Sequence, residues 1–125
     1  MWISYAIGKK LDSLKDILLN KNIQSYIFDE LVNEFMEVSS RSRLRKYISD
    51  IRRNETIKIM LIMSKKVNIR MKITAGNDPK DFYLLSLAKQ IKADYLITGD
   101  AALLTLNPFF GTMIVRYNEF VEKIV

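Results

Sequence analysis

The chain has 125 residues, of which 49% are hydrophobic and 27% charged, and it carries a net charge of +6. This length and composition predict one globular domain over residues 1–125 and exclude a disordered or low-complexity chain. The absence of Cys and His excludes disulfides, thiolate zinc sites, Ser-His-Asp triads and imidazole acid–base chemistry. Any chemistry must therefore use carboxylates, Lys, Tyr, hydroxyl groups, or a hard ion such as Mg²⁺ or Mn²⁺ with oxygen ligands.

The start of the chain does not have the pattern of a secretory signal. Its short apolar run is followed, and not preceded, by the positive charges of Lys9 and Lys10. No apolar run anywhere approaches the roughly 18–20 residues that span a bilayer. We therefore expect a soluble, cytoplasmic protein with no membrane partner.

Hydrophobic periodicity predicts helices that alternate with strands. In chain order we expect a helix over 11–18, a strand over 23–28, a helix over 29–38, a buried helix over 56–64, a strand over 67–73, a helix over 79–91, strands over 94–98 and 113–115, and a last helix through 124. Asp29 and Asn118 stand where the N-caps of two of these helices should be. The alternation predicts a three-layer α/β/α fold with a parallel sheet, in which sites gather at the carboxyl ends of the strands.

Residues 41–53 are strongly basic, with six cations against the single acid Asp50. The cations are Arg41, Arg43, Arg45, Lys46, Arg52 and Arg53. Such a segment is usually a solvated helix face, but it can also bind phosphates. In the second case, binding would weaken steeply with salt.

Four acids are expected near one edge of the predicted sheet. Asp100 directly follows a strand, Asp78 and Asp81 flank the start of a helix, and Glu34 lies in the helix after the first predicted strand. Carboxylates brought close together raise one another's pKa unless a cation lies among them, and such clusters support metal-assisted phosphodiester hydrolysis. The alternatives are that Asp78 and Asp81 cap a helix, Asp100 forms a turn and Glu34 is a solvated surface residue.

Two segments, Asp78–Ala88 and Ala93–Asp100, resemble motifs of the PIN-domain family, above all those of VapC-like toxins of prokaryotic type II toxin–antitoxin systems. Weaker similarity is found at Phe28–Phe35, Arg45–Tyr47, Leu103–Leu104 and Glu119–Phe120. The resemblance implies a ribonuclease that cleaves single-stranded RNA with Mg²⁺ or Mn²⁺ and a water nucleophile.

By position, the resemblance also implies roles for single residues. The metal-site acids would be Glu34, Asp81 and Asp100, with Asp78 as an additional acid and with Ser4 and Thr98 at supporting hydroxyl positions. The basic segment 41–53 would contact RNA. The toxin branch further implies a cognate antitoxin as partner, and a homodimer.

One departure from the family's pattern concerns its first strand, which runs into Asp-Thr-Asn and precedes Trp-Ile-Ser. This sequence opens on Met1, Trp2, Ile3 and Ser4, so the first strand and its acid are expected to be absent. With one acid fewer, we expect weak metal binding and weak or no cleavage. The alternative function is an inactive PIN remnant that binds RNA or protein. A nucleotide-binding module is disfavoured, because none of the four Gly residues forms a GxGxxG loop.

Overall fold

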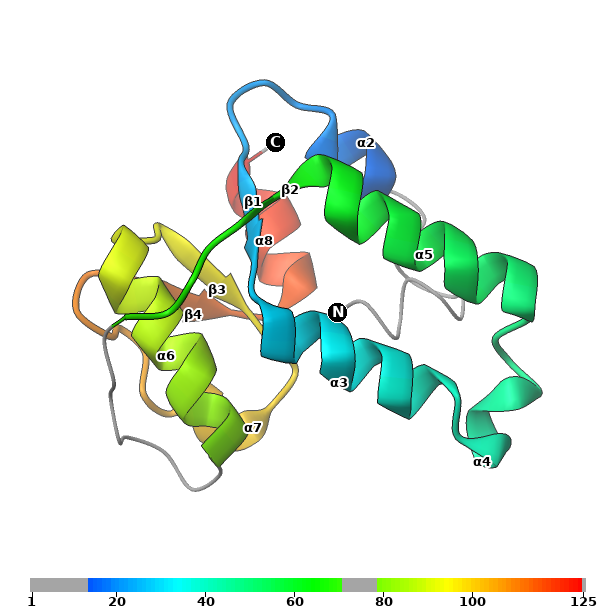
Figure 1. Cartoon of the computed structure of the whole chain (residues 1–125). Helices are drawn as coiled ribbons and strands as arrows, with labels where there is room; N and C mark the ends of the chain where they lie inside the picture. Colours follow the sequence, from blue (N-terminus) through cyan, green and yellow to red (C-terminus); the bar gives the residue numbers. More distant parts are fainter. Residues whose placement is uncertain (1–13, 71–78, 125) are drawn as a thin grey trace. The chain divides into compact units, whose positions relative to one another are not determined.

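The computed structural model describes residues 14–70 and 79–124. These residues form helices of different lengths and strands of three residues each. The chain divides into two compact units, an amino-terminal unit up to Asn68 and a carboxyl-terminal unit from Ile69 onward. Each unit contains one pair of parallel strands with helices packed on it (Figure 1).

The amino-terminal unit consists of α2 (Leu14–Leu18), β1 (Ser25–Ile27), α3 (Asp29–Ser39), α4 (Ser42–Arg45), α5 (Asp50–Met63) and β2 (Ser64–Lys66). β1 and β2 pair in parallel, with Ser25 opposite Ser64 and Ile27 opposite Lys66. The chain between them forms the long crossover that a parallel pair requires. Helices α3 and α5 pack against each other, and short α4 lies where they connect (Figure 1).

Local chemistry accounts for the start of α5. The Ser49 hydroxyl accepts a hydrogen bond from the Arg52 backbone N–H at 3.1 Å, which satisfies one of the unpaired donors at a helix start. Further along α5, Thr56, Ile59 and Met60 are buried, and Phe35 is the buried apolar residue of α3. These buried faces explain why the two helices pack together.

The carboxyl-terminal unit consists of α6 (Pro79–Ile91), β3 (Tyr95–Ile97), α7 (Ala101–Leu104), β4 (Met113–Val115) and α8 (Tyr117–Ile124). β3 and β4 pair in parallel, with Tyr95 opposite Met113 and Ile97 opposite Val115. Its core is built on Leu85, Leu103 and Ile114, which come from α6, α7 and β4. The Tyr95 and Phe120 rings meet edge to face at 5.1 Å and fasten α8 to β3.

The predicted α/β class with parallel strands is confirmed. The strand predicted over 67–73 is wrong in its described part, because the strand of this region is β2, which ends at Lys66. Residues 71–73 lie outside the described residues. β2 follows α5 directly, and its Ser-Lys-Lys sequence has no apolar alternation. Backbone pairing with β1 defines it, and this pairing extends to the Val67 N–H, which donates to the Ile27 carbonyl at 2.9 Å.

Three helix starts also differ from their predictions. α5 begins at Asp50 and not at Thr56, because Ser49 caps it. Phe28 and not Asp29 is the N-cap of α3, so Asp29 is the first helical residue, where an acid favours the helix dipole. Asn118 lies within α8, which begins at Tyr117, and the Glu119 carboxylate accepts from the Arg116 N–H just before the helix at 3.4 Å.

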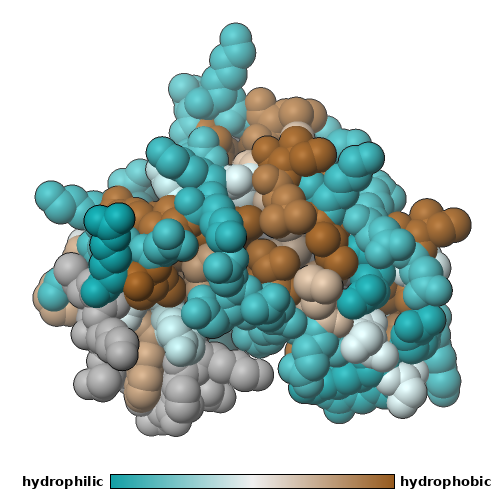
Figure 2. Space-filling model, in the orientation of Figure 1, coloured by the Kyte–Doolittle hydropathy of each residue, from teal (hydrophilic) through white to brown (hydrophobic). Residues whose placement is uncertain are grey.

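The surface mixes polar side chains with several exposed apolar ones, as one face shows in brown among teal (Figure 2). Among the described residues, the most exposed large apolar side chains are Ile51 and Ile62 of α5, at 81% and 70%. None of the described helices has both the length and the apolar character needed to cross a bilayer.

Candidate metal and nucleic-acid site

The carboxyl ends of β3 and β4 form the edge of the carboxyl-terminal unit that carries Asp100. We call it the β3–β4 edge and define it as Thr98, Gly99 and Asp100 after β3 and Arg116 after β4. Asp100 is exposed and is the N-cap of α7. Its Oδ1 accepts hydrogen bonds from the Ala102 N–H at 2.8 Å and the Leu103 N–H at 3.3 Å. Its other oxygen, Oδ2, makes no hydrogen bond to the described residues, so the carboxylate can cap the helix and still bind a cation.

Thr98 supports this arrangement through its side chain. Its hydroxyl oxygen accepts a hydrogen bond from the Asp100 N–H at 3.1 Å. Its backbone N–H donates to the Val115 carbonyl at 3.0 Å, which continues the pairing of β3 with β4 by one residue. Thr98 thereby fixes the backbone from which the Asp100 carboxylate projects.

Asp81 approaches the same end of the unit from α6. It lies in the first turn of α6 and is only 6% exposed. α6 packs on β3, and only residues 92–94 separate the two elements, so they run in opposite directions. Measured from residues 92–94, Asp81 lies about 15 Å back along α6, and Asp100 lies about 16 Å forward along the extended chain of β3. The start of α6, which carries Asp81, and the residues after β3, which include Asp100, therefore lie toward the same end of the unit.

Glu34 belongs to the amino-terminal unit, where it lies in α3 and is half-buried. The first-turn acid of the same helix, Asp29, forms an ion pair with Lys66 Nζ at 2.7 Å. Lys66 is the last residue of β2, so this pair joins the chain just after β1 to the carboxyl end of β2. Asp29 is thus used within its own unit, as a first-turn acid of α3 that also forms an ion pair.

The donor set of the carboxyl-terminal unit fits a hard divalent ion. Mg²⁺ is commonly bound through one or two carboxylates, with waters and substrate phosphates completing its shell. Asp81 and Asp100 are two acids that the topology of the unit brings toward the carboxyl end of β3. Within either unit, the described residues include no group of three or more acidic side chains placed to hold a metal ion. The predicted site residues Asp78 and Ser4 lie outside the described residues.

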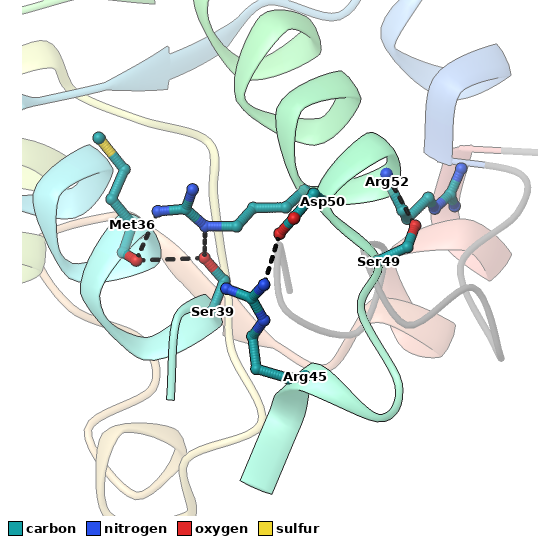
Figure 3. A network of polar contacts seen from close by, with 7 residues as sticks. Met36, Ser39, Arg45, Ser49, Asp50 and Arg52 are labelled. Atoms are coloured by element: carbon teal, nitrogen blue, oxygen red, sulfur yellow. Dashed lines mark hydrogen bonds and ion pairs between the residues drawn. The ribbon is translucent and has the colours of Figure 1, made fainter. Parts of the chain in front are cut away.

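The basic segment 41–53 contributes strongly to the fold of its unit (Figure 3). Arg53 of α5 donates from Nε to the buried Ser39 hydroxyl at 2.8 Å and from Nη2 to the Met36 carbonyl at 2.9 Å. It thereby satisfies carbonyl and hydroxyl acceptors at the carboxyl end of α3, where a positive charge is also favoured.

Three further cations of the segment pair with acids at its surface. Arg45 contacts Asp50 at 2.9 Å, as Figure 3 shows. The two other pairs are Arg41 with Glu37 at 3.1 Å and Arg52 with Glu55 at 3.8 Å. By contrast, Arg43 and Lys46 are exposed and pair with no acid in the described part of the chain. These two are the cations most available to a phosphate, and RNA binding by the segment stays a prediction.

Sequence reasoning missed Arg116, which lies on the β3–β4 edge. It directly follows β4, and its Nη1 lies 3.5 Å from the Gly99 carbonyl, next to Asp100. A signal in the sequence could have identified it, because sites of parallel sheets gather at the carboxyl ends of strands, and Arg116 follows a predicted strand as Asp100 does.

A family model described as PIN domain matches residues 1–102, which is most of the chain. No curated protein and no solved structure matches it. The match spans both units and includes the positions of Glu34, Asp81, Thr98 and Asp100.

Proposed function

The chain belongs to the PIN domain family, and from this premise we propose that it is a metal-dependent endoribonuclease. Membership indicates nuclease activity in general and the use of divalent metal ions in general. The proposal adds that the substrate is single-stranded RNA and the ion Mg²⁺ or Mn²⁺. The observation that carries it is the topology that brings the start of α6, with Asp81, toward the end of β3 that Asp100 follows, in a unit whose edge also exposes a cation.

We propose that Asp81 and Asp100 supply carboxylates to the ion, while Glu34 and Asp78 stay predicted ligands. When bound, a divalent ion would offset phosphate charge and lower the pKa of an attacking water. The chain's own residues orient the donors. Two backbone N–H groups hold Oδ1 of Asp100, and the Thr98 hydroxyl holds its N–H, so the free Oδ2 has a fixed position before any ion binds.

On the substrate side, we propose that Arg43 and Lys46 of the basic segment contact the RNA backbone, because they are exposed without acidic partners among the described residues. A toxin role, a cognate antitoxin, a homodimer and a cytoplasmic location stay predictions.

The test compares two aspartates that flank β3. Asp100→Asn removes the proposed ligand, while Asp94→Asn makes the same change at an exposed residue before the other end of the strand. Single-stranded RNA is incubated with each purified variant and Mn²⁺, and cleavage is followed on gels. We expect weak cleavage that requires Mn²⁺, is lost in Asp100→Asn and is retained in Asp94→Asn. Equal cleavage by both variants would contradict the assignment of Asp100.

A second measurement separates the enzyme from an inactive remnant. Melting of the wild-type chain is followed while Mn²⁺ is titrated, because an ion that binds only the folded state raises the melting temperature. A rise that Asp100→Asn abolishes supports the metal site. RNA binding with neither cleavage nor a Mn²⁺-dependent rise would favour the remnant.

A further inference from the structure

Arg116 lies beside Asp100 because β3 and β4 end in register. Ile97 is opposite Val115, and the Thr98 N–H donates to the Val115 carbonyl at 3.0 Å. The next residues along the two strands are therefore neighbours. The Arg116 guanidinium extends back across this edge, where Nη1 lies 3.5 Å from the Gly99 carbonyl.

The positive charge of Arg116 is not neutralised by any described acid. The Gly99 carbonyl is a neutral acceptor at the limit of hydrogen-bond distance. Glu119, the nearest acid along the chain, accepts from the backbone N–H of Arg116 and forms no ion pair with its guanidinium. Arg41 and Arg45 differ, since each contacts a carboxylate at about 3 Å.

The edge is also open to a ligand. Gly99 is exposed, and a Cβ added there would meet nothing within 4 Å. Asp100, the next residue along the chain, and Arg116, which contacts the Gly99 carbonyl, are both exposed as well. A group that approaches Gly99 thus comes next to the Arg116 guanidinium, which has no acidic partner among the described residues, and to the residue that follows Gly99, Asp100.

We propose that Arg116 binds a phosphate of single-stranded RNA and positions the strand against Asp100, an inference that rests on the proposed ribonuclease function. A guanidinium matches phosphate oxygens with two parallel N–H groups and remains charged at every physiological pH. A carboxylate alone would repel the phosphate. An adjacent guanidinium offsets that repulsion, so RNA can reach this edge before a metal ion binds.

The experiment measures RNA binding by the full chain without metal, so that no cleavage occurs. Affinity for a fluorescent single-stranded RNA is determined in EDTA at several salt concentrations. Arg116→Gln removes the charge and keeps most of the side-chain stem. Lys123→Gln removes one charge from an exposed residue in the last turn of α8, within the same unit. Thermal melting checks that each variant is folded.

We expect Arg116→Gln to weaken binding roughly tenfold, as is typical for loss of one charge-assisted hydrogen bond. The slope of log affinity against log salt should fall by about 0.7, the value for one phosphate contact with a single strand. Lys123→Gln should change affinity by less than about twofold, since its charge is not on the edge. Arg116→Lys should recover the salt slope and part of the affinity.

Two outcomes would overturn the inference: equal affinity and slope for Arg116→Gln and Lys123→Gln, or no RNA binding by the wild type. Failure of the proposed ribonuclease function would be seen in a different measurement, as an absence of Mn²⁺-dependent RNA cleavage by the wild type. RNA binding that depends on Arg116 without any cleavage would support this inference while contradicting the nuclease.

Discussion

The basic segment 41–53 and the β3–β4 edge both carry exposed charge, but they use it differently. In the segment, Arg53 completes the carboxyl end of α3, and Arg45 pairs with Asp50. At the edge, the side chains of Asp100 and Arg116 form hydrogen bonds only with backbone groups among the described residues. The segment has many more cations, yet most of them already have partners. The number of charges therefore says less about ligand binding than the number left without a partner.

The largest expected effect separates the two roles of Asp100. In Asp100→Ser, a hydroxyl can still cap α7 but no carboxylate remains, whereas Asp100→Ala removes both. We expect each to lower RNA cleavage by roughly 100-fold or more, because a metal site supplies several kcal/mol of transition-state stabilisation. Urea unfolding should show a loss of about 1 kcal/mol for Asp100→Ala and little change for Asp100→Ser.

RNA cleavage by Asp100→Ser at the wild-type rate would contradict the difference in function between the β3–β4 edge and the basic segment. Asp100 would then be a helix cap alone, and the β3–β4 edge would be structural in the same sense as the basic segment.

The second prediction concerns Arg53, the cation most deeply involved in the fold of its unit. Arg53→Ala leaves the buried Ser39 hydroxyl without the donor from which it accepts, and it leaves the Met36 carbonyl with the longer hydrogen bond from the Ser39 hydroxyl at 3.3 Å. We expect the free energy of unfolding to fall by about 1–3 kcal/mol, the range for hydrogen bonds to a charged group. Urea unfolding measures this change.

Arg43→Ala is the matched control, since it removes an exposed arginine of α4 that has no acidic partner among the described residues. It should change stability by less than about 0.5 kcal/mol. Equal losses for the two variants would mean that Arg53 has no special structural role.

The third prediction assigns RNA contact to the two unpaired cations of the segment. In Arg43→Ala/Lys46→Ala, affinity for single-stranded RNA should fall roughly tenfold, and the salt slope by about 1.4, because two phosphate contacts are lost. Unfolding in urea should be unchanged. If Arg41→Ala had the same effect on affinity, the exposed ion pair with Glu37 would not keep Arg41 from RNA, and pairing would be a poor guide to binding.

Elements defined by local sequence could be predicted closely. β4 matches its prediction at Met113–Val115, and α6 matches at Pro79–Ile91, because β-forming residues mark one and a proline with apolar periodicity marks the other. β2 could not be predicted, because its Ser-Lys-Lys sequence becomes a strand only through pairing with β1, which lies far away in the sequence. Propensity is weak where a distant partner supplies the hydrogen bonds.

At the candidate site, too, what depends on local sequence could be predicted and what depends on distant contacts could not. Asp100 was predictable because it directly follows a strand, and the family match extends over that position. The hydrogen bond from Arg53 to Ser39 could not be predicted, because it depends on where α3 ends, 14 residues earlier. The joint action of Glu34 with Asp81 and Asp100 stays a prediction, because it requires residues of both units.

The smallest expected effect concerns Arg45 and Asp50, whose side chains are 50% and 70% exposed. Their 2.9 Å contact is the shortest of the segment's ion pairs, yet water and salt screen both charges. In a double-mutant cycle with Arg45→Ala and Asp50→Ala, we expect a coupling energy below about 0.5 kcal/mol that vanishes in 1 M NaCl. A larger coupling that survived salt would show that this pair holds α4 against the start of α5. Arg45 would then stabilise the fold as Arg53 does. Arg43 and Lys46 would be set apart more clearly as the cations of the segment that are available to bind RNA.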